Sequence, residues 1–478
     1  MDKLNEFLGT FSDGLYTYVL IALLVGAGLY FTIRTRAVQF RLFPKMVKQI
    51  FFSRGGAGDG ISSFQAFAIG LASRVGTGNI AGVAMALVAG GPGAIFWMWV
   101  VALLGMATAF VEATLAQLFK IRWRDGTFRG GPAFYIHKAL GSWGLGAAFA
   151  VFLIFSFGIS FEMVQANTIA TTLEGSYDVN PWISAIGLVV ITIAILLGGI
   201  KRVAKVSEIM APLMAVIYVA LAIVVILLNL DRVIPIFQII FESAFGLREA
   251  VAGTAGGMLA ALLNGARRGL FSNEAGMGSA PNAASTATVS HPVKQGLIQS
   301  MGVFVDTVLV CSATAFIVLN ANSSVYTPGV ETPLNGAQLT ISSITDELGN
   351  WVEPLMILLI FVFAYSSIIG NFVYAEINMD YLTNGSTWGP HLLRGIVTVS
   401  VLVGAVLELG TVWTFADITM AFMAIINIIS IAILGKWAFG ALRDFEKTGG
   451  DKFIATDNPN LPGVLPTDVW VEREVAEA

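Results

Sequence analysis

The stretch Ser73-Arg-Val-Gly-Thr-Gly-Asn-Ile-Ala-Gly82 interrupts an apolar segment that is long enough to cross a bilayer. It carries glycines, hydroxyls, an amide and an arginine where a lipid-facing helix would carry Leu, Ile and Val. Backbone at membrane depth leaves the helical hydrogen-bond pattern only where it is buried in protein or lines a wet cavity. A broken helix there frees amides and carbonyls that can hold a carboxylate and a cation. The stretch therefore predicts a binding site inside a transporter.

The composition excludes an ordinary soluble protein. Of the 478 residues, 56% are hydrophobic and only 12% are charged, whereas soluble domains carry about 25% charged residues. A single cysteine, Cys311, excludes an intramolecular disulfide, and the three histidines lack metal-ligand spacing, so we expect no cofactor. No basic segment and cleavage motif open the chain, so the first apolar stretch predicts a retained helix rather than a signal peptide.

Apolar stretches of roughly 17–25 residues are the unit that crosses a bilayer as a helix. Eleven of them follow one another, so we expect an all-α polytopic membrane protein with about 11 transmembrane helices. We place them at residues 15–33, 62–88, 93–119, 147–172, 181–199, 207–229, 251–275, 294–320, 354–378, 391–409 and 412–434.

Lys and Arg are distributed unevenly between the loops. With these spans, 21 of the 27 lie in alternate loops and the tail, 3 lie on the other side and 3 lie within spans. Because Lys and Arg accumulate on the cytoplasmic side, we expect the N-terminus outside and the C-terminus in the cytoplasm. Residues 435–478 are polar and predict a cytoplasmic tail, and exposed termini of this kind favour a passive one. The external loop near 321–351 holds a possible short helix that can act as a partial lid.

Setting the first helix aside leaves ten spans, five in each half. An odd number of spans forces two repeats into opposite orientation. We expect an extra N-terminal helix and cytoplasmic loop at 1–61, one five-helix repeat at 62–230 and an inverted repeat at 251–434. The second repeat opens on another polar interruption, Asn264-Gly-Ala-Arg-Arg-Gly-Leu-Phe-Ser-Asn-Glu-Ala-Gly276. Interruptions in corresponding positions predict a binding site between the repeats.

Three longer motifs carry a family resemblance. They are the first interruption with its continuation Gly90-Gly-Pro-Gly-Ala-Ile-Phe-Trp-Met-Trp99, the segment Phe128-Arg-Gly-Gly-Pro-Ala133, and Gly269-Leu-Phe-Ser-Asn-Glu-Ala-Gly-Met-Gly-Ser-Ala-Pro281. Together they resemble the alanine or glycine:cation symporter family, the sodium:alanine symporters, over essentially the whole chain. The resemblance implies a leucine-transporter type of fold with one additional N-terminal helix. It also implies uptake of alanine or glycine with Na⁺ across a bacterial inner membrane.

The first interruption supplies most of the candidate substrate residues. Glycines allow close approach of the backbone, and the start of the following half-helix suits a substrate carboxylate. A hydroxyl and an amide add contacts, although tight helix packing alone also explains such residues. The candidates in this segment are Gly76, Thr77, Gly78 and Asn79.

Three amides elsewhere are further substrate candidates. Gln165 lies mid-span and is favoured by the resemblance, with hydrogen bonding between helices as its alternative role. Asn264 belongs to the second interruption and is a weaker candidate. Asn371 lies one turn after Ser367, and we expect it near the side-chain end of the pocket, where an Asn leaves room or polarity.

The wider fold implies a Na⁺ site between the first interruption and the third span of the second repeat. Na⁺ is a hard cation that suits neutral oxygens, although membrane serines often bond only to their own helix. The carbonyls and hydroxyls expected to bind it belong to Ala72, Val75, Phe363, Ser366 and Ser367.

Several charges lie at membrane depth, where they are costly unless paired or hydrated. We expect Arg74 to form a cytoplasmic gate with Glu274 or another carboxylate of the second interruption. For most of the others we expect structural pairs or positions at helix interfaces: Glu112, Glu162, Arg267, Arg268, Asp306, Glu376 and Asp417.

The leading hypothesis is Na⁺-coupled symport of a small neutral amino acid by alternating access, without enzyme activity and without nucleic-acid binding. H⁺ coupling through Glu112, Glu162 or Glu274 is the main alternative. A channel is disfavoured by two unequal interruptions in one chain. An intramembrane enzyme is disfavoured because familiar hydrolase motifs are missing from the sequence. The sequence does not determine substrate ranking, stoichiometry or oligomeric state.

Overall fold

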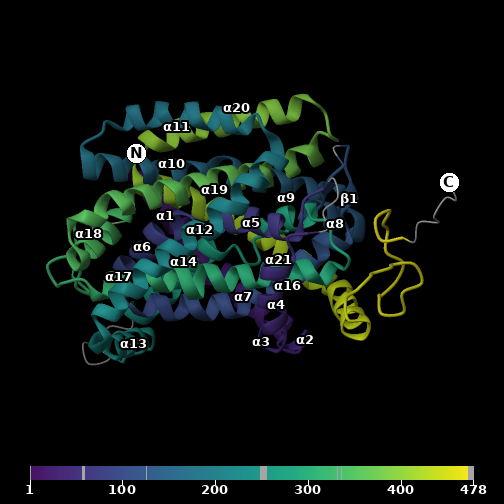
Figure 1. The fold of residues 1–478 in the computed structure, drawn as a ribbon, viewed down its shortest axis with the longest axis horizontal. Helices are drawn as coiled ribbons and strands as arrows, with labels where there is room; N and C mark the ends of the chain where they lie inside the picture. Colours follow the sequence, from purple (N-terminus) through teal and green to yellow (C-terminus); the bar gives the residue numbers. More distant parts are fainter. Residues whose placement is uncertain are drawn as a thin grey trace.

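The computed structural model describes residues 2–55, 60–124, 126–247, 256–330, 332–334 and 336–471. Figure 1 shows a bundle of long helices that run mostly along the horizontal axis of the view. One end of the bundle carries α18 (Ala337–Leu348) and α13 (Leu230–Ala244), and we call it the loop face. The other end carries α8 (Pro132–Leu140) and the yellow segment 449–471, and we call it the tail face. A two-stranded antiparallel sheet, β1 (Ile121–Arg122) and β2 (Phe128–Arg129), also lies there.

The predicted all-α membrane architecture is confirmed. Within the described residues, eight helical stretches are long and apolar enough to span a membrane, or nine when the bent pair at 63–90 counts as one span. The two remaining predicted spans fall on α11 (Pro181–Leu196), which is short, and α14 (Gly256–Asn273), which contains two arginines. The start of the second repeat at 251 and the external Arg248 lie outside the described residues.

The N-terminal part and the first predicted repeat consist mainly of helices, with β1, β2 and α8 between α7 and α9. The segments η1 to η3 in the list below and η4 in the second half are π-helical turns. The elements are α1 (Asp2–Leu15), η1 (Tyr16–Leu20), α2 (Ile21–Arg34), α3 (Val38–Arg41), α4 (Phe43–Phe52), α5 (Ser63–Arg74), η2 (Gly78–Gly82), α6 (Val83–Gly90), α7 (Gly93–Leu118), α9 (Trp143–Phe155), η3 (Ser156–Ser160), α10 (Phe161–Tyr177), α11 and α12 (Gly199–Leu228).

The second half follows the same pattern. Its elements after α13 and α14 are α15 (Ala280–Thr286), α16 (Pro292–Val303), η4 (Phe304–Cys311), α17 (Ser312–Asn320), α18, η5 (Asn350–Val352), α19 (Glu353–Leu382), α20 (Trp388–Val406) and α21 (Leu409–Thr448). The short external helix expected near 321–351 is α18, and its Thr340 hydroxyl donates to the Ile80 carbonyl of η2 (3.3 Å).

The first interruption lies where the sequence predicts it. α5 begins with a capping box, in which Ser62 Oγ accepts from the Gln65 amide and Gln65 Oε1 accepts from the Ser62 amide. The helix ends at Arg74, and the chain bends by 47° before it continues as η2 and α6. Val75 has φ −78° and ψ 85°, so the helical hydrogen-bond pattern stops there.

The second interruption lies later than predicted. α14 runs unbroken through the predicted region to Asn273, and the chain leaves helical geometry only between Glu274 and Ser279. Glu274, Gly276 and Gly278 have φ of 59°, 88° and 79°, which end the helix. The expected start at Asn264 is therefore wrong, because a glycine and polar residues inside a packed helix do not by themselves break it.

The tail packs against the bundle, and it begins later than predicted. The boundary at 435 falls inside α21, which extends to Thr448. Residues 449–471 then fold back onto the tail face, where the Phe453 amide donates to the Ser290 carbonyl (2.9 Å). Trp470 is 6% exposed, and its Nε1 donates to the Gln117 carbonyl (2.8 Å) at the end of α7. The segment carries enough apolar side chains to pack, and whether its role is passive stays a prediction.

We predict that Trp470→Ala releases the tail. The substitution removes the Nε1 hydrogen bond and the edge contact with the Phe453 ring (5.5 Å). Limited proteolysis should then cut between 449 and 471 several-fold faster than in the wild type, because cleavage follows local opening. Val464→Ala is the matched control, since Val464 is 94% exposed. Equal cleavage of all three proteins would contradict the docking.

His291 connects this region to α16 and is held neutral. Its Nδ1 accepts from the Val293 amide (3.2 Å) and its Nε2 lies 3.2 Å from Asp444 Oδ2. Burial lowers the pKa of His291 from 6.5 to about 4, and the Asp444 carboxylate offsets this only in part.

We therefore predict a loss of stability in mild acid. A group whose pKa is lower in the folded state contributes fully above its unfolded value of 6.5, and the contribution disappears as the pH falls towards 4. The effect is at most on the order of 3 kcal/mol. Thermal unfolding between pH 7.5 and 4.5 should show a smaller decrease in Tm for His291→Gln than for the wild type. Parallel curves would exclude a role for this histidine.

Candidate functional site

The last turn of α5 and the middle of α19 bring together a group of oxygen atoms. The Ala72 carbonyl accepts from Ser367 Oγ (3.0 Å) and Ser366 Oγ (3.3 Å). The Phe363 carbonyl accepts from the same two hydroxyls, at 3.2 and 2.8 Å. Val75 follows Ala72 by three residues and is the first non-helical residue. Four of the five predicted Na⁺ ligands therefore lie in one cluster, and the fifth adjoins it in the chain.

This cluster fits a monovalent hard cation. Every oxygen in it is neutral, and all five residues are buried. Carbonyl and hydroxyl oxygens are the ligand type that hard cations take from proteins. The hydroxyl protons point to the carbonyls, and rotation of the two serine O–H groups would turn their lone pairs to an ion.

The turn after Val75 positions backbone amides beside the ion cluster. The Gly76 amide donates to Asn79 Oδ1 (2.9 Å), and the Thr77 amide donates to Gln165 Oε1 (3.3 Å). A Cβ on Gly76 would lie 2.1 Å from Ser367 Oγ and 3.3 Å from Gln165 Oε1. Gly76 is thus the point where the interruption, α10 and α19 meet, and only a glycine fits there.

Two polar atoms at this junction have no partner within the described part of the chain. They are Thr77 Oγ1 and Asn371 Nδ2, and both are buried. Asn371 Oδ1 lies 2.6 Å from Ser73 Oγ, which orients the amide. Because burying an unpaired polar group costs free energy, these two atoms are suited to bind a ligand. Asn371 lies one turn after Ser367, as the sequence suggests.

Glu274 joins the two interruptions, but through serines rather than Arg74. Its carboxylate accepts from Ser73 Oγ (2.6 Å) at the end of α5 and from Ser279 Oγ (2.6 Å) before α15. Arg74 instead donates from Nη1 to the Gln299 carbonyl (3.1 Å) of α16. Its Nε and Nη2 have no hydrogen-bond partner in the described residues. In this conformation, then, the expected direct Arg74–Glu274 pair is not formed.

Arg74 nevertheless lies in the field of several buried carboxylates. It attracts Glu112, Glu274 and Asp306, although none of them forms an ion pair with it within the described residues. Glu112 is held by the Gly276 amide (3.2 Å) and Asn427 Nδ2 (2.8 Å). Each carboxylate is held by hydrogen bonds, while the Arg74 guanidinium acts on all three from a distance.

Asn264 lies apart from this site. It is two turns before the end of α14, and its Nδ2 donates to the Ala260 carbonyl (3.0 Å) in its own helix. A Cβ on Gly90 of α6 would lie 2.9 Å from the Asn264 Cβ. The residue therefore packs α14 against α6, and the geometry does not bring it to the other candidates.

Sequence reasoning missed the role of Asp306 in η4. Its Oδ1 accepts from Asn79 Nδ2 (2.7 Å), and its Oδ2 accepts from Ser272 Oγ (2.8 Å) and Thr307 Oγ1 (2.8 Å). Asp306 thus connects the first interruption to the end of α14. A carboxylate at membrane depth was one signal of a role for Asp306, and the polar Ser272 in the second interruption was another. The spacing of the two residues along the chain does not reveal that they are in contact. π-helical turns such as η4 are frequent at functional sites.

A column of aromatic rings lies beside η2, with Phe271 next to Gly78 and Trp413 next to Gly82, and sequence reasoning also missed it. Phe271 of α14 stacks on Phe161 of α10 (4.3 Å) and packs against Trp413 of α21 (4.6 Å). Arg268 lies over the Trp413 ring (4.5 Å) and forms a buried ion pair with Asp417. The expectation of a structural pair for these two charges is confirmed, but no sequence pattern predicts the ring column.

Comparison with known proteins identifies the family. The model of the sodium:alanine symporter family matches residues 1–455. The chain belongs to this family. It is 45% identical to the amino-acid carrier protein AlsT of Bacillus subtilis over 99% of both chains. It is 43% identical to the "Probable sodium/glutamine symporter GlnT" of the same organism, over 95% of this chain and 94% of that one.

The fold has a solved counterpart. The structure of MhsT in complex with L-phenylalanine superimposes with a TM-score of 0.53, at 17% identity, and covers 80% of this chain and 89% of that one. The leucine-transporter type of fold is therefore confirmed. Members of the family are multi-pass membrane transporters rather than enzymes, and Na⁺ is their coupling ion.

We predict that Gly76→Ala abolishes transport without unfolding the protein. The new methyl group would overlap Ser367 Oγ, so the ion cluster and the amide turn would have to separate. Uptake in proteoliposomes should fall at least about a hundredfold, because misplacing a binding group by about 1 Å costs this much. Gly187→Ala in α11 is the control, since a Cβ there meets no atom within 4 Å. Normal uptake by Gly76→Ala would refute the assigned site.

Proposed function

We propose that this protein imports a small neutral amino acid, alanine or glycine, together with Na⁺ across a bacterial inner membrane. One observation supports the proposal above the others: the oxygen cluster at Ala72 and Ser367 is directly continuous with the amide turn at Gly76. A cation in the cluster and a carboxylate at the turn would attract each other across a few ångströms of low-dielectric interior. Binding of either would therefore favour the other.

We further propose that Thr77 and Asn371 bind the substrate. Their buried atoms Thr77 Oγ1 and Asn371 Nδ2 have no hydrogen-bond partner in the described residues. The hydroxyl can bond to the carboxylate or the ammonium group of an amino acid, and the amide N–H can donate to its carboxylate. Gln165, Gly78 and Asn79 complete the binding site. The ring of Phe271 lies 3.0 Å from a Cβ built on Gly78, which limits the length of a side chain in that direction.

The proposed site is occluded, in keeping with alternating access. Gly76, Thr77, Gln165 and Asn371 are fully or almost fully buried. On the loop face, we assign closure to the ring column and the Arg268–Asp417 pair. On the tail face, we assign it to Glu274 with its two serine partners, while Arg74 supplies the long-range attraction. The proposed orientation has the loop face outside and the tail face in the cytoplasm.

The test is uptake of radiolabelled alanine and glycine into proteoliposomes under imposed gradients. An inward Na⁺ gradient should drive accumulation, and Ser367→Ala should raise the Na⁺ concentration for half-maximal uptake about tenfold or more, since it removes one ion ligand. Thr398→Ala is the control, because this hydroxyl bonds only to the Arg394 carbonyl of its own helix. Failure of the Na⁺ gradient to drive accumulation would refute the proposal.

Competition distinguishes the substrate classes in the same assay. Alanine and glycine should suppress labelled alanine uptake at lower concentrations than glutamine, because of the Phe271 ring beside Gly78. The reverse ranking would assign the chain to larger amide substrates, in line with the name of the relative GlnT, a probable sodium/glutamine symporter.

Coupling to H⁺ is a second candidate, and one observation favours it. Both carboxylate oxygens of Glu162 in α10 are buried and have no partner within the described residues. An unpaired carboxylate charge inside a membrane is costly, so Glu162 is suited to carry a proton. In the uptake assay, an inward H⁺ gradient without Na⁺ should drive alanine accumulation in the wild type and not in Glu162→Gln if protons are coupled here.

A further inference from the structure

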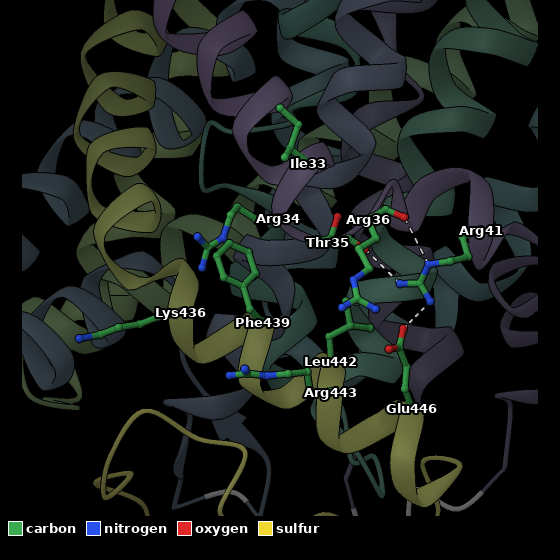
Figure 2. Close-up of a pocket in the computed structure, with 10 residues that line it drawn as sticks. All are labelled: Ile33, Arg34, Thr35, Arg36, Arg41, Lys436, Phe439, Leu442, Arg443 and Glu446. Carbon is green, nitrogen blue, oxygen red and sulfur yellow. Dashed lines mark hydrogen bonds and ion pairs between the residues drawn. The ribbon is translucent and has the colours of Figure 1, made fainter.

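A pocket rich in positive charge lies where the extra N-terminal helix meets the end of α21. It is about 320 Å³ in volume. Figure 2 shows five cationic side chains around it, from the end of α2, the turn that follows, α3 and the last turns of α21. They are Arg34, Arg36, Arg41, Lys436 and Arg443.

The one acidic residue that lines the pocket is already paired. Glu446 Oε1 accepts from Arg41 Nη1 (2.5 Å), and the same guanidinium donates to the Thr35 carbonyl (3.0 Å) and the Arg36 carbonyl (3.2 Å). Arg41 thus fixes the turn that lines the pocket. The other four cations have no carboxylate partner within the described residues. Among the described residues the pocket therefore carries a net positive charge, which suits an anion.

The turn that forms the pocket is strained. Arg36 and Ala37 have φ of 54° and 53°, a left-handed conformation that non-glycine residues seldom adopt twice in succession. Such conformations persist where the surroundings impose them, and they concentrate at binding sites. Here the Arg41 hydrogen bonds impose the turn. Arg34 is also held in place, with its guanidinium over the Phe439 ring at 5.2 Å.

The pocket borders the apolar surface of the bundle. Directly before it, Ile33 of α2 is 73% exposed, and one turn before Lys436, Ile433 of α21 is 57% exposed. These side chains face lipid in a membrane-spanning helix, so the adjoining cations lie at the level of the headgroups. Ile33, Phe439 and Leu442 also line the pocket itself, beside the charged groups.

We propose that this pocket binds the phosphate of an anionic phospholipid. Phosphate is the anion that several guanidinium and ammonium groups bind together, and basic pockets between transmembrane helices on the cytoplasmic side take lipid headgroups. A soluble phosphate shares the headgroup chemistry. The lipid is favoured because the pocket combines cations with apolar side chains at the edge of the lipid-facing surface. The acyl chains would lie along Ile33 and Ile433.

The bound lipid would connect parts of the molecule that are far apart in sequence. Arg36 follows the first helix, whereas Lys436 and Arg443 belong to the last. Arg443 Nη2 also donates to the Asn460 carbonyl (3.2 Å) of the docked tail. The headgroup would therefore stabilise the junction of α2, α21 and the tail. This site is separate from the substrate and ion residues, so its test does not depend on the proposed transport function.

The test is a titration of the purified full-length protein in neutral detergent. Native mass spectrometry counts bound phosphatidylglycerol and phosphatidylcholine with identical acyl chains, and thermal unfolding reports the effect of each lipid and of inorganic phosphate. The test variant is Arg36→Gln with Lys436→Gln, two exposed side chains without hydrogen-bond partners in the described residues. The matched control is Lys48→Gln with Lys205→Gln, which removes the same charge from exposed positions outside the pocket.

Phosphatidylglycerol should bind the wild type and the control pair equally and raise the Tm of both. Its affinity for the test variant should fall about thirtyfold, the effect expected from two basic residues at an anionic surface. Equal binding of phosphatidylcholine would overturn the proposal, as would an equal loss in the control pair. Stabilisation by inorganic phosphate that matches phosphatidylglycerol would also overturn it, because the site would then be one for soluble anions.

Discussion

The structure depends on one constraint: backbone that leaves the helix inside a membrane must find its hydrogen bonds elsewhere. At the first interruption, side chains from distant helices supply them. Gln165 Oε1 accepts from the Thr77 amide, and Thr314 Oγ1 donates to the Asn79 carbonyl (2.6 Å). At the second, Glu112 Oε1 accepts from the Gly276 amide and Asn427 Nδ2 donates to the Gly276 carbonyl (2.8 Å). Each break is thereby tied to the helices around it.

These bonds explain why several polar side chains at the site are already hydrogen-bonded within the protein. Asn79 uses its side chain on both the Gly76 amide and Asp306, so its first task is to hold the turn. Ser272 holds Asp306 in place. A site assembled in this way is rigid in one conformation and can change only by exchanging partners. The buried charges can also exchange partners, because Arg74 attracts three carboxylates and forms an ion pair with none of them here.

The sequence predicts the architecture better than it predicts contacts. Hydropathy and the loop charges reveal the spans, and the motif at Ser73–Gly82 locates the first interruption because its glycines and Val75 lie at the bend itself. The second interruption was placed too early, since Asn264 and its neighbours are polar for a different reason: they pack α14 against α6 and α21. Sequence reasoning also predicts a pair between Arg74 and Glu274 or another carboxylate of the second interruption, whereas Glu274 bonds to Ser73 and Ser279. Such choices among nearby partners depend on side-chain geometry, which hydropathy and motif spacing do not contain.

The docked tail has a mechanical consequence. The Thr288 amide donates to the Ile61 carbonyl (2.9 Å), so the strand-like segment after α15 lies between the start of α5 and the tail residue Phe453. On the tail face, the residues before α5, the segment after α15 and the C-terminal tail therefore lie side by side in that order. The tail is also joined to the end of α7, because Trp470 Nε1 donates to the Gln117 carbonyl. Any movement of α5 or α15 away from α7 would therefore have to break the tail contacts at Phe453 and Trp470 or carry the tail along with it.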